Sequence, residues 1–381
     1  MANIQYAEEF YMSNEALKQF KPTPASIPPR EVNYRLRLSE GVPVHIHALN
    51  PLAFLLRAAQ VYPNKLALVH ADVPYPVIYS YGVWAQRIQN FAYALIQAGV
   101  KPNDRIAIIA PNMSAYHGVL GARAVICAIN TRLTHGEVAY ILEHSESKLI
   151  FVDHEYTHLV EGAKVPVIVI NDTGREDDPY EQFLTSGRKF SGERGWPGLE
   201  WERDEDAPCA LNYTSGTTGR PKGVLTTLRG SYLAAIANAY ETGMGRDSTY
   251  LWILPMFHAS GWCYPWAITF AASAQICLRS VSYPHIWHHL LNSRVTHYCG
   301  APTVQIGLIN APQARRLERP VHAIIAGSAP TAHLIGELEK INIIPIHVYG
   351  LTCTYGPSTK CYYQPHWMSL SLEERAKLLA R

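Results

Sequence analysis

The segment from Tyr213 to Gly223, YTSGTTGRPKG, has the strongest chemical character in the chain. It combines three glycines, four hydroxyl side chains and one lysine. Glycines let backbone N–H groups approach a ligand closely and form a concave anion site. A lysine adds a point charge of the kind that binds phosphate. The segment therefore predicts a loop that holds a polyphosphate, with Lys222 as its cation and hydroxyl donors from Thr214, Ser215, Thr217 and Thr218.

Two other interpretations of this loop are weaker. A Walker A loop requires GxxxxGK followed by Ser or Thr. Here Gly223 follows Lys222, and the glycine spacing differs, which argues against a P-loop phosphotransferase. A plain polar surface turn would account for a generic Gly/Thr loop but not for the complete string.

Further segments follow in a fixed order: LPMFHASGWCYPW around His258, AGSAP from Ala326, and VYGLTCTYGP from Val348. Together with YTSGTTGRPKG they resemble the adenylate-forming, or AMP-binding, superfamily, in its acyl-CoA synthetase branch. The resemblance extends from about Pro51 to Pro357. It implies ATP-dependent activation of a fatty or aromatic carboxylic acid to an acyl-adenylate and then to a CoA thioester.

The resemblance also implies roles for individual residues. His258 would lie near the acyl carboxylate, and Trp262 would gate the acyl tunnel. Tyr349, followed by Gly350, would stack on adenine, and Thr352 would reach the α-phosphate. ATP, Mg²⁺ and CoA are the implied ligands, with Thr214 near the metal. The loop around the β- and γ-phosphates would be Thr214, Ser215, Gly216, Thr217, Thr218 and Gly219 beside Lys222, and the adenine side would be Gly327, Ser328 and Ala329.

Two departures from the resembled pattern bear on activity. The family's metal-binding glutamate falls at Cys353, and a thiol is a poor ligand for Mg²⁺. The family's β-barrel and C-terminal lid, with its adenylation lysine, find no counterpart in the sequence. We therefore expect a truncated form of low activity, and a non-catalytic nucleotide- or acyl-binding relative is the alternative.

Composition supports a globular protein without nucleic-acid partners. The chain has 381 residues, 48% hydrophobic and 17% charged, and a net charge of +2. That charge is too balanced for nucleic-acid binding. The first twenty residues have no signal-peptide pattern, and the seven scattered cysteines favour a reducing compartment. Ser248 to Leu278 lacks charges but contains prolines, so we expect broken strands and no membrane span. These features favour a cytoplasmic or peroxisomal location.

Alternating apolar runs and capped amphipathic segments must position these motifs. Ser80 and Thr134 are predicted helix caps, Thr134 in a capping box with Glu137. Alternating strands and helices predict an α/β fold of two similar doubly wound subdomains, with the site in the cleft between them at the carboxyl ends of strands. The expected units are an irregular segment at 1–50, subdomains at 51–203 and 204–360, and a C-terminal segment at 361–381. Exposed loops are predicted from Asn171 to Asp206, where charged residues, Gly and Pro accumulate.

Overall fold

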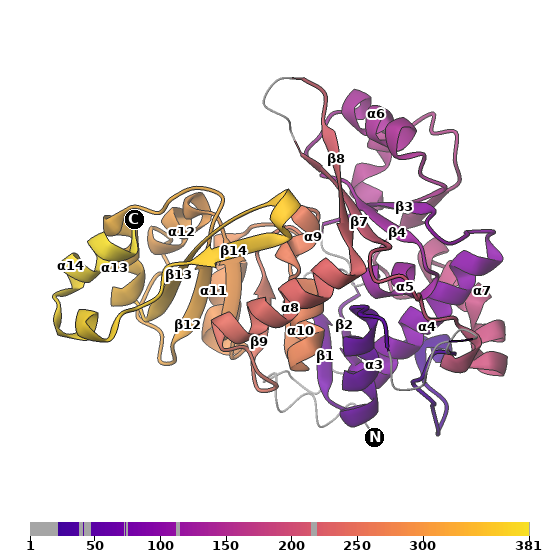
Figure 1. Cartoon of the computed structure of the whole chain (residues 1–381), viewed down its shortest axis with the longest axis horizontal. Coiled ribbons are helices and arrows are strands. Elements are labelled where there is room, and N and C mark those ends of the chain that lie inside the picture. Colours follow the sequence, from indigo (N-terminus) through magenta and orange to yellow (C-terminus); the bar gives the residue numbers. More distant parts are fainter. Residues whose placement is uncertain are drawn as a thin grey trace.

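The computed structural model describes residues 22–37, 41, 47–71, 73, 75–111, 115–214 and 219–380. Two mixed sheets form its centre, with helices packed around them (Figure 1). The predicted α/β architecture of two sheet-based subdomains is therefore confirmed. In the part of the chain that the structure describes, no helix has the length and apolar character needed to span a membrane.

Parallel pairing dominates both sheets, and each antiparallel strand lies at an edge. The inner parallel strands are mostly buried, as expected for parallel strands covered on both faces. The antiparallel edge strands Lys222–Thr227 and Gly356–Lys360 are mostly exposed or half-buried. The eight-stranded sheet has the order β14 (Gly356–Lys360), β13 (Ile343–Leu351), β12 (Val321–Ile325), β11 (His297–Gly300), β9 (Thr249–Trp252), β10 (Ala274–Cys277), β1 (Leu66–His70) and β2 (Val77–Ser80). The six-stranded sheet has the order β6 (Val167–Ile170), β5 (Leu149–Asp153), β3 (Arg105–Ile109), β4 (Val125–Ala128), β7 (Pro208–Thr214) and β8 (Lys222–Thr227).

The two sheets exchange strands between the halves of the chain. β1 and β2 come from the first half, yet β1 pairs in parallel with β10 in the eight-stranded sheet. β7 and β8 come after residue 203, yet β7 pairs with β4 in the six-stranded sheet. The expected boundary at residues 203 and 204 therefore does not coincide with the division between the sheets. At one edge of each sheet lies a hairpin from the other half of the chain, and these two hairpins connect the halves.

Local sequence signals explain several helices. The Ser80 side chain accepts a hydrogen bond from Val83 N at the start of α4 (Tyr81–Gln97), and Thr134 forms the expected capping box in α6 (His135–Ser145). The remaining helices around the sheets are α3 (Leu52–Val61), α5 (Tyr116–Gly121), α8 (Leu228–Thr242), α9 (Ala259–Trp262), α10 (Tyr264–Ala271), α11 (Tyr283–Asn292), α12 (Pro302–Ile309), α13 (Ala332–Lys340) and α14 (Leu372–Leu379).

The prediction of exposed loops from Asn171 to Asp206 is wrong in its centre. A helix, α7 (Pro179–Arg194), occupies it and packs against α4. Asp178 caps this helix by accepting from Tyr180 N, and Pro179 fits its first position. The polar composition concealed the helix because part of its buried face is polar: Glu181 pairs with the buried Arg87.

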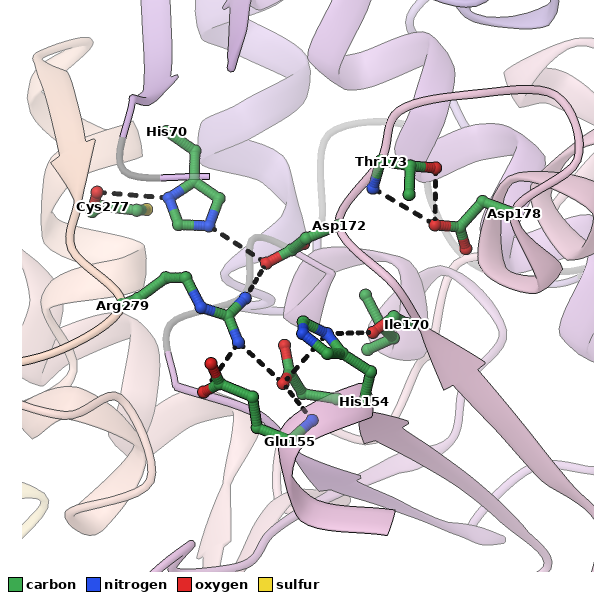
Figure 2. A network of polar contacts seen from close by, with 10 residues as sticks. His70, His154, Glu155, Ile170, Asp172, Thr173, Asp178, Cys277 and Arg279 are labelled. Atoms are coloured by element: carbon green, nitrogen blue, oxygen red, sulfur yellow. Dashed lines mark hydrogen bonds and ion pairs between the residues drawn. The ribbon is translucent and has the colours of Figure 1, made fainter. Parts of the chain in front are cut away.

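A polar cluster joins the two sheets at the carboxyl ends of β1, β5, β6 and β10 (Figure 2). Arg279, just after β10, contacts Asp153 at 2.8 Å and Glu155 at 3.0 Å, and also forms a hydrogen bond with Asp172. His70, at the end of β1, lies 3.3 Å from Asp172. Charges from one sheet therefore meet carboxylates from the other, which fixes how the sheets sit relative to each other.

Candidate functional site

The predicted phosphate loop connects β7 to β8. Thr214 and Lys222 are paired across the ladder at the loop end of this hairpin. Thr214 is half-buried, while Lys222 and Gly219 are exposed. The predicted loop residues Ser215, Gly216, Thr217 and Thr218 lie outside the described residues.

Both stems of this hairpin rest on α6, which lies beside β8 (Figure 1). His144 Nδ1 lies 2.8 Å from the Tyr213 hydroxyl, which precedes Thr214. One turn earlier, the Tyr140 hydroxyl donates to Pro221 O at 3.4 Å, and the Arg220 guanidinium lies 5.2 Å above the Tyr140 ring. Residues 140 and 144 share one helix face, so a single face of α6 fixes the hairpin ends that carry Thr214 and Lys222.

His258 lies beyond the carboxyl end of β9, at the start of α9. Its side chain is exposed, and its ring centroid lies 4.8 Å from that of Phe257. Desolvation by the surrounding protein and the charge of Arg132 lower the pKa of His258. Both effects favour the neutral imidazole. Arg132 belongs to the loop between β4 and α6. The charge that acts on His258 therefore comes from the part of the molecule that contains the six-stranded sheet.

The predicted adenine side lies at the carboxyl ends of β12 and β13. Gly327, Ser328 and Ala329 follow β12 and are exposed. Tyr349, near the end of β13, is 60% exposed, so its side chain is accessible to a ligand. Gly350 is required by close approach, because a Cβ there would lie 1.8 Å from Gly356 O.

Trp262 is half-buried and closes α9. Its carbonyl accepts a hydrogen bond from Asn238 Nδ2 at 2.8 Å, and its backbone lies against Gly356. The proposed gate thus contacts the turn that follows Thr352. Its gating role stays a prediction.

Tyr355 is a positioning residue that the motif comparison did not single out. Its hydroxyl lies 3.1 Å from both Thr227 N and Thr227 Oγ1, at the base of β8. Gly230 makes room for the ring, since a Cβ there would lie 2.1 Å from Tyr355 Cζ. The VYGLTCTYGP segment is thereby tied to the hairpin that carries Lys222.

Some of the described motif segments contact one another although they are far apart in the sequence. α9 packs against β7 and β14, and β8 contacts the short helix Thr352–Thr354. Thr214, His258, Gly327 and Thr352 all lie at or just beyond strand ends where ligands of α/β proteins commonly bind.

The donor set near these strand ends fits Mg²⁺ poorly. Thr352 is half-buried and Cys353 is exposed, so the residue at the expected glutamate position offers sulfur and no carboxylate. Within the described ranges, no group of three or more His, Cys, Asp or Glu side chains is arranged to hold a metal ion. Mg²⁺ is usually held by one or two carboxylates together with substrate phosphates, whereas the predicted residues that the structure describes offer hydroxyls, such as those of Thr214 and Thr352, and no carboxylate.

The pattern that defines the AMP-binding enzyme family matches residues 55–376. The chain belongs to this family. The resemblance drawn from the motifs is thereby confirmed, and the match includes the hairpin, the His258 turn and the carboxyl ends of β12 and β13.

Similar proteins with curated names are CoA ligases. This AMP-binding enzyme is 36% identical over 376 residues to a peroxisomal acetate/butyrate–CoA ligase of Arabidopsis thaliana, covering 89% of this chain and 63% of that protein. It is 36% identical over 347 residues to 4-hydroxybutyrate–CoA ligase 2 of Metallosphaera sedula, covering 87% and 62%. A peroxisomal trans-cinnamate:CoA ligase of Petunia hybrida is 34% identical over 365 residues, covering 87% and 62%. The chain thus spans less than two thirds of the length of these relatives.

Solved structures share the fold. The N-terminal domain of FACL13 from Mycobacterium tuberculosis superimposes with a TM-score of 0.72 at 22% identity, covering 87% of this chain and 81% of that one. The o-succinylbenzoate CoA synthetase MenE from Bacillus subtilis, in complex with ATP and magnesium ion, superimposes with a TM-score of 0.66 at 22% identity, covering 82% and 62%.

Proposed function

We propose that this AMP-binding enzyme forms the nucleotide- and acid-binding part of an acid–thiol ligase of the acyl-CoA synthetase type. A carboxylic acid, fatty or aromatic, reacts with ATP to give an acyl-adenylate and pyrophosphate, and CoA then takes the acyl group. The observation that carries the proposal is the contact of α9, which follows His258, with β7 and β14, together with the contact of β8 with the helix Thr352–Thr354. The names of the related CoA ligases point to the same chemistry.

The reaction needs no nucleophile from the protein. A carboxylate oxygen attacks the α-phosphorus, and the bond to pyrophosphate breaks. The protein's task is to hold two anions together and to stabilise the charge that develops on the phosphoryl oxygens. Lys222 and Thr214 would bind the outer phosphates, with Ser215, Gly216, Thr217, Thr218 and Gly219 between them, and Thr352 would contact the α-phosphate.

The acid would lie beside His258. A neutral imidazole, favoured by the lowered pKa of His258, can donate one hydrogen bond to a carboxylate without neutralising the nucleophile. Adenine would lie between Tyr349 and the chain at Gly327, Ser328 and Ala329, and Trp262 would limit the acyl end.

The proposal also covers the binding of magnesium and the location of the protein in the cell. A Mg²⁺ bound by the nucleotide phosphates would have Thr214 as its nearest predicted protein ligand, and Cys353 offers it no oxygen. No step is assigned to the metal. The location is peroxisomal or cytoplasmic, and the names of two related ligases, which include the word peroxisomal, support the first of these.

The test is ATP–pyrophosphate exchange against short aliphatic and cinnamate-type acids. It is run on this chain and on any longer sequence that contains it. Acid-dependent exchange by either protein would support the proposal. Nucleotide binding without exchange in both would favour the alternative, a non-catalytic nucleotide- or acyl-binding relative, to which the thiol at Cys353 already points.

A further inference from the structure

The turn after His258 has an unusual backbone. Five successive residues have positive φ: 43° at Ala259, 44° at Ser260, 60° at Gly261, 54° at Trp262 and 63° at Cys263. Residues with a Cβ rarely adopt this left-handed conformation, and seldom in succession. Such a segment persists only where its surroundings hold it in place. The contacts that hold the turn therefore determine where His258 and Trp262 lie.

Three elements hold this left-handed turn. Ser260 Oγ donates to Asn212 Oδ1 at 2.9 Å, which connects the turn to β7. Asn238 of α8 donates to the carbonyl of Trp262 at 2.8 Å. Gly356 of β14 lies directly against Trp262. Of these three contacts, the one to Asn212 leads to the predicted phosphate loop, because Thr214 follows two residues later on the same strand.

Asn212 is an unfavourable residue for the stability of a buried strand. It is only 2% exposed, and its Nδ2 has no hydrogen-bond partner in the part of the chain that is described. A buried amide with an unsatisfied donor lowers stability compared with an apolar side chain of the same shape. Stability alone therefore does not explain an asparagine here, whereas its bond to Ser260 gives it a positional role.

We infer that Asn212 and Ser260 form a positioning pair that sets the distance between the phosphate loop and the His258 turn. The inference rests on the proposed function, since it assumes that the loop holds the nucleotide and the turn holds the acid. Neither side chain needs to touch a ligand. Displacing one reactant by even a small distance lowers the fraction of complexes that can react, so this pair would matter for ligands that occupy both sides at once.

Binding measurements can separate this role from a purely structural one. The ligands are ATP, which occupies the nucleotide side, and a butyryl sulfamate ester of adenosine, which occupies both sides. The variants are Ser260→Ala and Asn212→Leu. The matched control is Thr226→Val, which removes a buried hydrogen bond of 3.2 Å to Ala210 O in the same hairpin but has no link to the turn.

We expect both variants to bind ATP within twofold of the wild type and to bind the acyl sulfamate at least tenfold more weakly. Thr226→Val should leave the ratio of the two affinities unchanged. Asn212→Leu removes the orphan amide donor but leaves the buried hydroxyl of Ser260 without its acceptor, so the unfolding midpoint of each variant is measured beside its affinities. Equal acyl sulfamate affinity in all four proteins, or an equal loss in the control, would overturn the inference. If Asn212→Leu does not fold, Ser260→Ala carries the comparison alone.

Hydrogen exchange keeps the inference testable without ligand. If the wild type binds neither ligand, the proposed function fails. The hydrogen bond between Ser260 and Asn212, here called the tie, is then tested by the exchange rates of the backbone amides of residues 259–263. Trp262 N donates to His258 O at 3.3 Å, so its exchange reports on the turn. Exchange at least tenfold faster in Ser260→Ala, and unchanged in Thr226→Val, supports the tie. Unchanged exchange in both variants shows that the pair does not hold the turn.

Discussion

Lys222 is the one cation within the predicted phosphate segment that lies at the first pair of the hairpin, opposite Thr214. It is exposed, so its charge is available to a ligand. Arg220, two residues earlier, instead lies over the ring of Tyr140. The two cations of the segment therefore differ: Arg220 helps to fix the hairpin, and Lys222 is the proposed phosphate ligand.

We expect Lys222→Ala to weaken ATP binding by about 1–3 kcal/mol, the usual loss for a charge-assisted contact. Calorimetry with ATP measures it. Lys101→Ala is the control, because Lys101 is also exposed but lies in the turn before β3. Equal affinities of Lys222→Ala and the wild type would remove Lys222 from the site.

Cys353 allows a direct test of metal binding. Cys353→Glu would place an oxygen ligand where the resembled family has one, so ATP affinity should become more dependent on Mg²⁺. The measurement is ATP affinity with and without Mg²⁺. Cys353→Gln, similar in shape but uncharged, is the control. If the glutamate variant gains no more Mg²⁺ dependence than the glutamine variant, residue 353 does not face the metal.

At the scale of elements, the base of α8 joins two motifs. Gly230 lies in the first turn of α8, and Tyr355 packs over it while its hydroxyl contacts Thr227. The helix start, the base of β8 and the segment after β13 thus form one unit. A substitution that moves Tyr355 should therefore alter the structure of both the hairpin segment and the segment after β13.

Gly230→Ala tests this unit. Its Cβ would lie 2.1 Å from Tyr355 Cζ, so the ring must move, and we expect a loss of about 1–3 kcal/mol in the free energy of unfolding. The matched control is Gly136→Ala in the first turn of α6, where a Cβ would meet nothing within 4 Å. That variant should be neutral or more stable by up to about 1 kcal/mol. Denaturant unfolding of both compares them, and equal stability of the two variants would contradict the close packing at Gly230.

At the scale of the molecule, Arg279 holds the two sheets together through carboxylates of the other sheet (Figure 2). Arg279→Ala would leave Asp153, which is 1% exposed, without its cation. We expect a loss of about 3–5 kcal/mol in the free energy of unfolding, as for other broken buried pairs. Arg175→Ala, which removes a solvent-exposed ion pair to Asp177, should change stability little. A small effect of Arg279→Ala in denaturant unfolding would show that the cluster does not join the sheets.

The same cluster predicts a loss of stability in acid. Burial alone would raise the pKa of Asp172, but its hydrogen bond to His70 and the charges of His70 and Arg279 outweigh burial and lower the pKa. A carboxyl whose pKa is lower in the folded state stabilises the fold above its unfolded value of about 3.9 and loses that contribution as the pH falls further. The wild type should therefore lose more stability between pH 5 and pH 3 than Asp172→Asn. Parallel unfolding curves for the two proteins over this interval would contradict the assignment.

The local elements and the motif residues follow from the sequence alone. Ser80 and Thr134 mark helix starts because a cap depends only on neighbouring residues. The glycines, hydroxyls and lysine of YTSGTTGRPKG indicate a phosphate loop because their chemistry is contained in one short segment. Helix α7 was missed because Glu181 reads as a surface residue until its partner Arg87, far away in the sequence, is known.

Which strands share a sheet, and which contacts connect the motifs, depends on the three-dimensional packing. β1 joins β10, and β7 joins β4, because strand pairing depends on contacts between distant segments that no local pattern encodes. The same is true of three positioning residues, whose local sequence gives no sign of their roles. Asn212 is identified by its contact with Ser260, Tyr355 by its contact with Thr227, and Arg132 by its effect on His258. The motifs indicate which chemical groups are present. The packing of α9 against β7 and β14 determines how the segments that carry these groups lie relative to one another.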